Sequence, residues 1–388
     1  MGSWDLDADL EALRTQRLYR RLRTIEGPEE PEVVVDGRPA ILLCSNNYLG
    51  LANHPEVVAA AREVLERYGA GSGSSRLISG HLRIHADLEE RIAEWKGAEA
   101  AIVFSSGYHA NLGVLQALVG AGDAILSDEL NHASLIDGCR LSRAEVRVYR
   151  HGDPGSLEEA LRATAGARRR LVVTDSVFSM DGDRAPLAAI CEVAERHGAE
   201  VMVDEAHATG LCGATGAGLV EELGLRDRVL VQMGTLGKAL GSFGAYVAGR
   251  RSLVELLVNR ARTFIFTTAL PPATVGAAGC AIDIVRREPE RRSRVAENAR
   301  MLRERLVGAG YRVPPVESPI LPVMIGESGA TMRLCERLLD KGVFAQGIRP
   351  PTVPPGTSRL RVTVMATHGA AELDRAARAF EAAIVEER

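Results

Sequence analysis

The sequence has few of the residues that mark a secreted or a metal-binding protein. It contains six cysteines in 388 residues, none of them in a C-x-x-C pair, and its nine histidines are not clustered. This spacing argues against a zinc site and against a disulfide framework. Reduced thiols in a cytoplasmic protein are the simplest explanation, because disulfides persist mainly in oxidising compartments.

Long apolar runs and a large excess of one charge are also absent. No stretch of about 18 apolar residues could span a membrane, and the acidic, amphipathic start lacks the apolar core of a signal peptide. Lys and Arg number 47 against 51 for Asp and Glu, so the formal net charge is −4. Nucleic-acid binding usually needs a strongly basic domain. We therefore expect neither a membrane nor a nucleic acid among the partners.

A regular alternation of short apolar runs and helical patterns begins at about residue 100. Seven candidate strands follow one another, at 101–104, 124–127, 146–149, 171–174, 201–204, 229–233 and 245–249. Helical patterns lie between them, and the one at 186–198 opens with Pro and closes with Gly, as helices prefer. Continuously apolar strands that alternate with helices predict an α/β fold with a mostly parallel sheet covered on both faces.

The two ends of the chain have a different pattern. Residues 1–50 predict a helix and a pair of strands, with Asp36-Gly37 as a strong hairpin turn. Residues 271–388 predict two helices over about 273–308, strands near "LPVMI" and "RLRVTV", and a closing helix from about 369. We expect a large domain over 51–270 and a smaller α+β domain over 271–388, with residues 1–50 packing on the smaller one.

Polar side chains gather where the candidate strands end. The segments "FSSGYHAN", "SDELNHAS", "TDSVFSMDGD" and "DEAHATG" each follow a strand, and "TLGKALG" follows the sixth strand. In an open α/β sheet, ligands bind outside the carboxyl ends of the strands. We expect these five segments to face one crevice.

Lys238 stands among glycines after the sixth candidate strand. The segment does not spell a phosphate-binding P-loop, because Gln232 and Ala239 occupy the places where that motif needs Gly and then Ser or Thr. Lys238 is then either a solvated residue of a loose loop or an amine kept for covalent chemistry. Its glycine neighbours would let a cofactor and a substrate approach the backbone closely.

The polar residues at the strand ends match the needs of pyridoxal 5'-phosphate. That cofactor requires a lysine for a Schiff base, a carboxylate for its pyridine nitrogen and a cradle for its phosphate. The helix that begins after Gly107 could hold the anion, which would leave Asp204, His207 and Lys238 around a flat ring. Each residue also has a plain alternative, since Asp204 could cap a helix and His132 and His207 could be core histidines.

With these motifs in order, the sequence resembles the α-oxoamine synthases. These are fold-type I pyridoxal-phosphate enzymes that join an amino acid to an acyl thioester with loss of carbon dioxide. The resemblance runs from "SNNYLGLANHPEV" at 45 to "RPPTVPPGTSRLRVT" at 349. Within the family, "FIFTTALPP" and "IRPPTVPPGTSRLR" are most similar to members that condense L-alanine with a pimeloyl thioester in biotin biosynthesis. The thioester would be that of CoA or of an acyl carrier protein.

The resemblance implies a role for each residue of the central cluster. Lys238 would bind the cofactor and later move the proton at the substrate Cα. Asp204 would pair with the pyridine nitrogen, and His207 would donate to the phenolic oxygen of the ring. His132 would lie over the ring face, where it would contact cofactor and substrate. No metal ion is implied.

Further contacts are implied by the same resemblance. The other cofactor contacts would be Gly107, Tyr108, Ser179, Thr235, Thr267 and Thr268, of which the last two would reach the cofactor of the other subunit in a homodimer with shared active sites. The substrate contacts would be Asn46 and Arg361 at the amino-acid carboxylate, Thr352 in the acyl pocket, and Arg20 or Arg21 at the carrier phosphates or the pimeloyl carboxylate. An arginine suits a carboxylate because its guanidinium binds both oxygens.

The sequence motifs are also compatible with other functions. Related enzymes join glycine to acetyl-CoA or succinyl-CoA, or serine to palmitoyl-CoA. A protein that keeps the fold and binds a ligand without catalysis is a different class, and the intact Lys238, Asp204 and His207 argue against it. A dinucleotide-dependent dehydrogenase lacks support, because no G-x-G-x-x-G opens a helix after the first candidate strand.

Overall fold

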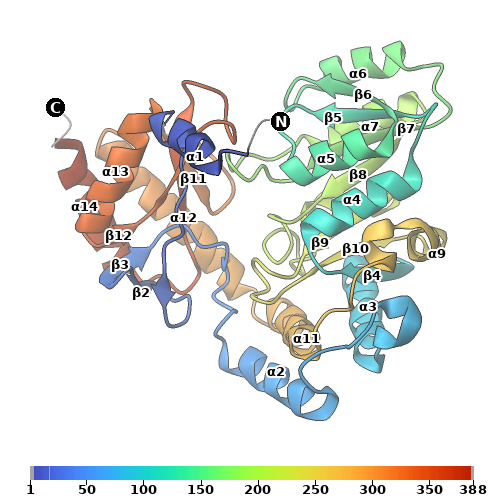
Figure 1. Ribbon diagram of the computed structural model, residues 1–388, viewed down its shortest axis with the longest axis horizontal. Helices are drawn as coiled ribbons and strands as arrows, with labels where there is room; N and C mark the ends of the chain where they lie inside the picture. The colour runs from blue at the N-terminus through green and yellow to red at the C-terminus, as the bar shows by residue number, and fades with distance from the viewer. Residues whose placement is uncertain (1–3, 17, 386–388) are drawn as a thin grey trace. The chain divides into compact units, whose positions relative to one another are not determined.

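The computed structural model describes residues 4–16 and 18–385, and their packing forms two compact units. The large unit contains residues 47–179 and 183–294. The small unit contains the described residues up to 46, the short segment 180–182 and the described residues from 295 onward. Figure 1 traces both units from the N-terminus to the C-terminus.

The large unit is built around a seven-stranded sheet of order β4-β10-β9-β8-β7-β5-β6. Its strands are β4 (Ala100–Phe104), β5 (Ala124–Asp128), β6 (Glu145–Tyr149), β7 (Arg170–Asp175), β8 (Glu200–Asp204), β9 (Val231–Thr235) and β10 (Ala245–Gly249). In this sheet β10 is antiparallel to both of its neighbours, and the remaining pairings are parallel. The predicted seven-stranded, mostly parallel α/β fold is confirmed.

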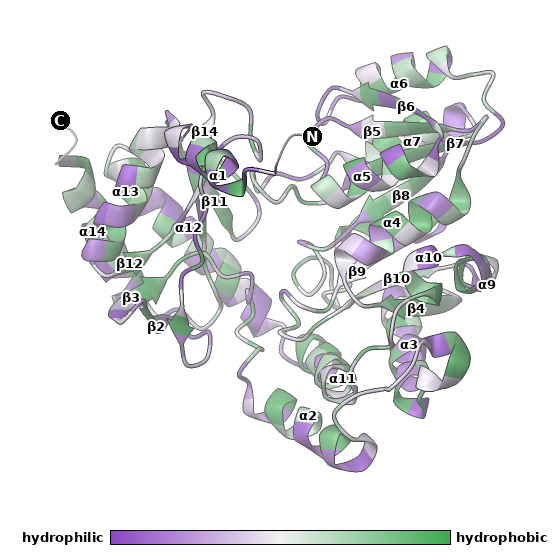
Figure 2. Ribbon diagram, viewed as in Figure 1, coloured by the Kyte–Doolittle hydropathy of each residue, from purple (hydrophilic) through white to green (hydrophobic). Residues whose placement is uncertain are grey.

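Helices of the large unit lie before, between and after these strands in the chain. They are α2 (Pro55–Tyr68), α3 (Arg83–Lys96), α4 (Gly107–Leu118), α5 (Ala133–Ser142), α6 (Pro154–Ala163), α7 (Leu187–Arg196), α8 (Leu219–Glu222), α9 (Arg251–Arg260), α10 (Arg262–Ile265) and α11 (Pro272–Arg287), with short turns η1 (Arg76–Gly80) and η2 (Arg226–Arg228). The central strands β7, β8 and β9 are buried except at the first residues of β7 and β8, and they carry mostly the hydrophobic colour in Figure 2. Helix α11 packs on α2 and α3, and so belongs to this unit.

The small unit contains two small sheets. One has the order β1-β2-β3-β12, with β1 (Ile25–Glu26), β2 (Glu32–Val35), β3 (Arg38–Leu42) and β12 (Val343–Phe344). The other has the order β11-β14-β13, with β11 (Ile320–Gly326), β14 (Ser358–Thr363) and β13 (Gln346–Ile348). Asp36 and Gly37 form the turn between β2 and β3 with φ values of 49° and 77°. Positive φ at both positions is the hairpin geometry that an Asp-Gly pair favours.

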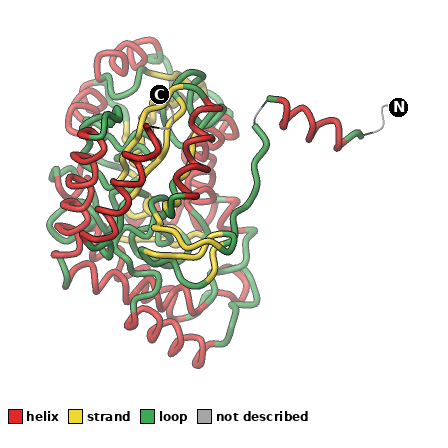
Figure 3. Tube along the Cα trace, turned by 90° about the vertical axis from the view of Figure 1, so that its left-hand side faces the viewer, coloured by secondary structure: helices red, strands yellow, loops and turns green. Residues whose placement is uncertain are grey.

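Helices α12 (Glu290–Gly308), α13 (Ser328–Asp340) and α14 (Ala370–Val385) complete the C-terminal part of the chain. Near the N-terminus, α1 (Leu6–Thr15) begins at Asp5, whose carboxylate accepts the amide N–H of Ala8. No described residue of α1 is buried, and Figure 3 shows this helix standing clear of the other elements of the small unit. None of the helices in the described part of the chain combines the length and apolar character required to cross a bilayer.

One buried ion pair connects α3 to the loop after β8. The Lys96 amine donates to the Glu205 carboxylate, and the two side chains are 1% and 0% exposed. Lys96 also donates to the carbonyl of Ala217, while Glu205 accepts the Val220 N–H at 2.9 Å. Such a pair is stable only when further hydrogen bonds satisfy both charges, as they do here.

A second charged group of the large unit is His151, held between two carboxylates. Its Nδ1 lies 3.0 Å from Asp128 Oδ1, and its Nε2 lies 2.7 Å from Asp183 Oδ2. Burial alone would lower the pKa of His151, but its hydrogen bonds to the two carboxylates raise that pKa to about 10. The imidazole is therefore a cation at neutral pH, with both N–H groups donating.

Candidate active site

Lys238 and His207 are in direct contact in the large unit. The Lys238 Nζ lies 2.9 Å from His207 Nε2, and His207 Nδ1 lies 2.8 Å from the hydroxyl oxygen of Tyr48. Tyr48 and His207 are buried, whereas Lys238 is partly exposed after β9. The Lys238 amine is thus partly accessible to solvent, while the His207 imidazole beside it is positioned by the Tyr48 hydroxyl at its other ring nitrogen. Sequence reasoning missed Tyr48, although it lies inside the motif "SNNYLGL".

The Asp204 carboxylate ends β8 and is 3% exposed. Its Oδ1 accepts the Ala206 N–H at 2.8 Å, and its Oδ2 accepts the side-chain amide of Asn111 at 2.8 Å. Asp175 pairs with Asp204 in the register of β7 and β8, so the two carboxylates lie at adjacent strand ends. Burial raises the pKa of Asp175 well above its usual value, and the charge of Asp204 raises it further.

His132 caps the N-terminus of α5 and is an exposed residue. Its backbone N–H donates to Asp175 Oδ2 at 2.8 Å. Its Nδ1 lies 2.7 Å from Ser134 Oγ and accepts the Ser134 N–H at 3.2 Å. Ser134 Oγ in turn contacts the side-chain amide of Asn111 at 2.8 Å. Asn111 and Ser134 are further site residues that sequence reasoning missed, and neither stands out from the apolar helices that carry them.

The first turn of α4 is suited to an anion. Ser106 caps this helix, and a Cβ added at Gly107 would lie 2.8 Å from Thr235 Cγ2, so only Gly fits there without a shift. The first N–H groups of a helix have no intrahelical acceptor and carry the positive end of its dipole. Tyr108 is the next residue, and its exposed hydroxyl donates to Asp137.

The backbone of the loop that carries Lys238 packs closely against the backbone at Ala52. The Gly241 N–H donates to the Lys238 carbonyl at 2.9 Å. Gly241 has a φ of 61°, and a Cβ there would lie 2.3 Å from the Ala52 nitrogen. This glycine is therefore required by the protein's own backbone, in addition to any approach of a ligand.

Thr267 and Thr268 follow α10 in the large unit. Thr268 forms an isolated antiparallel bridge with Ser75, and both threonines line a small cavity of about 20 Å³ together with Arg76 and Ser105. Ser179 lies in the loop after β7, directly before the segment 180–182 of the small unit.

The residues expected to bind the amino-acid carboxylate lie in the small unit. Arg361 is 7% exposed on β14, the middle strand of its sheet. The Thr363 hydroxyl donates to the Ser45 carbonyl at 2.7 Å, which brings the neighbouring Asn46 close to the end of the same strand. Arg361 and Asn46 therefore belong to the same unit.

The residues expected to bind the acyl group line one cavity of the small unit, of about 430 Å³. Arg20, Arg21 and Thr352 contribute to its wall, together with Arg349. Arg21 lies 3.7 Å from the Glu336 carboxylate. Burial lowers the pKa of Arg349, and the charge of Arg20 lowers it further. The cavity thus combines positive charge with an apolar lining.

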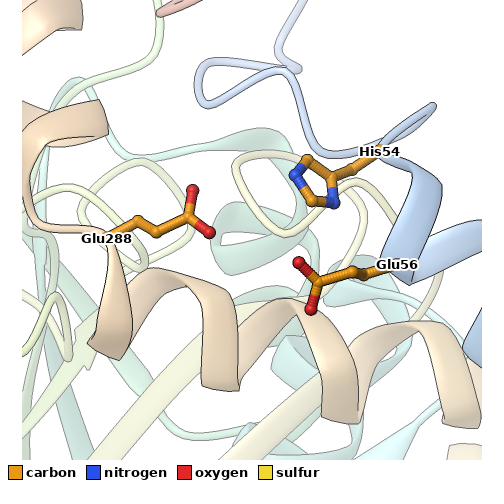
Figure 4. A group of neighbouring side chains, drawn as sticks. All are labelled: His54, Glu56 and Glu288. Atoms are coloured by element: carbon orange, nitrogen blue, oxygen red, sulfur yellow. The ribbon is translucent and has the colours of Figure 1, made fainter.

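His54, Glu56 and Glu288 form a cluster whose ligand atoms lie within 4.8 Å of one another (Figure 4). Arginine side chains already bind its carboxylates. Arg287 Nη2 lies 2.8 Å from Glu56 Oε1 and 3.0 Å from Glu288 Oε1, and Arg291 Nε lies 2.7 Å from Glu288 Oε2. Ion pairing accounts for this cluster without a metal ion.

Residues 38–380 match the family model of class I and II aminotransferases. The chain belongs to this family. It is 53% identical to the 8-amino-7-oxononanoate synthase of Geobacter sulfurreducens over 96% of each chain. It is 54% identical to the enzyme of the same name from Anaeromyxobacter dehalogenans, over 95% of this chain and 92% of the relative.

Solved structures agree with these relationships. A serine palmitoyltransferase from S. paucimobilis with bound PLP superposes with a TM-score of 0.93 at 34% identity, covering 98% of this chain and 97% of that one. The 8-amino-7-oxononanoate synthase of Francisella tularensis superposes with a TM-score of 0.77 at 26% identity, covering 90% of this chain and 98% of that one. The predicted membership among the α-oxoamine synthases of fold type I is confirmed.

The chain is accordingly a pyridoxal-phosphate enzyme, as predicted. The residues present fit this cofactor. They supply an accessible lysine amine, the buried carboxylate of Asp204, and the first turn of α4, where Gly107 leaves no room for a side chain. The side-chain oxygen of Asn111 is a further buried polar atom, and it has no partner among the described residues.

Proposed function

We propose that this chain condenses L-alanine with a pimeloyl thioester to give 8-amino-7-oxononanoate, releasing carbon dioxide and the free thiol. The observation that carries the proposal is the identity of 50–54% to enzymes named for this product over nearly the whole length of the chain. The contact between Lys238 and His207 and the buried Asp204 supply the chemical groups that the reaction requires.

The large unit would supply the acid–base groups. Pyridoxal 5'-phosphate, when bound, stabilises negative charge at the alanine Cα by accepting electrons. Lys238 would bind this group and then use its amine to remove and return the proton at Cα. Asp204 would hold a positive charge on the pyridine nitrogen, and His207 would donate to the phenolic oxygen. Their hydrogen bonds to Asn111 and Tyr48 fix the positions of both side chains.

Further residues of the large unit would contact the phosphate, the phenolic oxygen and the ring face of the cofactor. The N–H groups of Gly107 and Tyr108 and the hydroxyl of Thr235 would hold the phosphate. Ser179 would approach the phenolic oxygen, and His132 would lie over the ring. The support is the first turn of α4 beside Thr235 and the exposed position of His132 at the start of α5.

The small unit would bind the two substrates. Arg361 and Asn46 would orient the alanine carboxylate, and Thr352 would line the acyl pocket. Of the two arginines, we propose that Arg20 meets the carboxylate or phosphates of the acyl donor. Arg21 lies 3.7 Å from the Glu336 carboxylate, whereas Arg20 forms no ion pair with another described residue. An Arg20→Ala variant should therefore raise the KM for the acyl donor more than Arg21→Ala does.

We also propose a homodimer in which Thr267 and Thr268 reach the cofactor phosphate of the other subunit. Three large apolar side chains near these threonines are exposed in the single chain: Leu77 at 51%, Ile78 at 79% and Phe266 at 70%. The bridge between Ser75 and Thr268 joins the segments that carry them. Contiguous exposed apolar surface usually marks an interface.

A panel of amino acids and acyl thioesters tests the proposed reaction. Thiol release and carbon dioxide should appear together, in equal amounts, with L-alanine and pimeloyl-CoA or pimeloyl acyl carrier protein. Lys238→Ala should abolish both while the protein still folds, because the partly exposed side chain leaves no cavity in the core. Turnover with glycine and acetyl-CoA, or with serine and palmitoyl-CoA, but not with alanine and the pimeloyl donors, would replace the proposed substrates.

A further inference from the structure

A continuous chain of hydrogen bonds connects Asp204 to His132. The Asn111 side-chain nitrogen lies 2.8 Å from Asp204 Oδ2 and 2.8 Å from Ser134 Oγ. Ser134 Oγ lies 2.7 Å from His132 Nδ1. The two intermediate side chains are sealed from solvent, with Asn111 at 0% and Ser134 at 1% exposure.

The direction of each hydrogen bond in this chain follows from the groups involved. An ionised carboxylate only accepts, so the amide nitrogen of Asn111 donates to Asp204. The second hydrogen of that nitrogen points to Ser134 Oγ, which therefore accepts it. The hydroxyl hydrogen of Ser134 remains for His132 Nδ1.

A second observation gives the same direction at His132. The backbone N–H of Ser134 also donates to His132 Nδ1, at 3.2 Å, as part of the cap of α5. A nitrogen that accepts from a backbone N–H carries a lone pair, and in a neutral imidazole the proton is then on the other nitrogen. A proton on Nδ1 would face the N–H of Ser134 directly.

We propose that Asn111 and Ser134 are positioning residues that hold His132 as the neutral tautomer with its proton on Nε2. The inference rests on the proposed function only for the contact of His132 with cofactor and substrate. In that role His132 offers Nε2–H as a hydrogen-bond donor and cannot accept a proton there. Proton transfer at the substrate Cα is then left to the Lys238 amine.

The other groups around His132 are consistent with a neutral ring. Although His132 is exposed as a residue, partial desolvation of its ring by neighbouring atoms lowers the pKa of His132, the charge of Asp204 opposes this effect, and the charge of Lys238 adds to it. Asp175 accepts the backbone N–H of His132 and not a ring nitrogen. Ser134 donates to the neutral form of the ring, which also disfavours protonation.

Nitrogen-15 NMR of the full-length protein labelled in its histidines tests this proposal, with a His132→Gln variant to assign the signal. We expect an unprotonated Nδ1 and a protonated Nε2 at neutral pH, both with and without added pyridoxal 5'-phosphate. Ser134→Ala should raise the pKa of His132 by about 0.5 to 1 unit, the effect of losing one hydrogen bond to the neutral form. Ser134→Thr keeps the hydroxyl and should restore the original pKa.

Ser176→Ala is the matched control for this experiment. Ser176 is also a fully buried serine, and its hydroxyl donates to the backbone carbonyl of Asp204 at 2.9 Å and not to a ring nitrogen of His132. Its removal should leave the signals of His132 unchanged. A proton on Nδ1 of the unsubstituted protein would overturn the proposal even if Ser134→Ala failed to fold. A pKa of His132 that Ser134→Ala does not move, or that Ser176→Ala moves equally, would also overturn it.

The NMR measurement uses no substrate, so its result is independent of the proposed reaction. If the protein released no thiol from any pimeloyl donor, the tautomer of His132 would still be measured. If the tautomer were wrong while turnover was normal, the proposed reaction would stand and His132 would need another role.

Discussion

Removing the charge of Lys96 should destabilise the large unit far more than breaking an ion pair at its surface. In Lys96→Met, the Glu205 carboxylate stays buried at 0% exposure without its partner, and the Ala217 carbonyl loses a donor. An uncompensated buried charge typically costs about 3–5 kcal/mol. The free energy of unfolding of the large unit should fall by that amount.

The fluorescence of Trp95 provides the assay. The sequence contains two tryptophans, Trp4 and Trp95, so a Trp4→Phe background leaves one reporter. Trp95 is 3% exposed on the same helix as Lys96, and its indole donates to the Thr215 carbonyl at 3.1 Å. Urea titrations followed at this tryptophan therefore report unfolding of the region around the ion pair.

Two further variants make the result interpretable. Arg83→Gln breaks an exposed pair on the same helix, in which Arg83 and Asp87 lie 2.7 Å apart with 73% and 48% of their side chains exposed. Such a pair contributes only about 0.3–0.5 kcal/mol. Adding Glu205→Gln to Lys96→Met removes the unpaired charge and should recover most of the loss. Equal effects of Lys96→Met and Arg83→Gln, or no recovery in the double variant, would refute this reasoning.

Three other predictions concern the site and the assembly. Asp204→Asn should slow exchange of the alanine Cα proton with deuterated solvent much more than it weakens cofactor binding; exchange at the unsubstituted rate would contradict its role. Replacing both Thr267 and Thr268 with Val should weaken cofactor retention and make the dimer dissociate more readily on dilution, as measured by sedimentation. A fully active monomer at micromolar concentration would exclude a shared site. His151 has a folded pKa of about 10, above its unfolded value of 6.5, so its stabilisation is complete below pH 6.5 and is lost as pH rises through 10. His151→Gln should therefore flatten the stability profile over that range, and a profile identical to that of the parent would disprove the assignment.

The order of elements and the chemistry of the site could be predicted from the sequence. Most strands of the central sheet are largely apolar runs, because burial on both faces demands it, whereas the edge strand β6 reads EVRVY and is mostly exposed. Polar residues at the strand ends made Asp204 and Lys238 candidates for the site, since the carboxyl ends of parallel strands share one edge. The turn at Asp36-Gly37 was predictable because positive φ at both positions restricts the choice of residues.

Other features depend on contacts between residues far apart in the sequence, and only the tertiary structure decided them. Packing on α2 and α3 assigns α11 to the large unit, whereas its sequence is that of any amphipathic helix. Asn111 lies 23 residues from Ser134 and 93 from Asp204, so no local pattern could predict that its amide joins them. Local periodicity determines which face of an element is buried, but the partner of a buried polar group is set by the path of the whole chain.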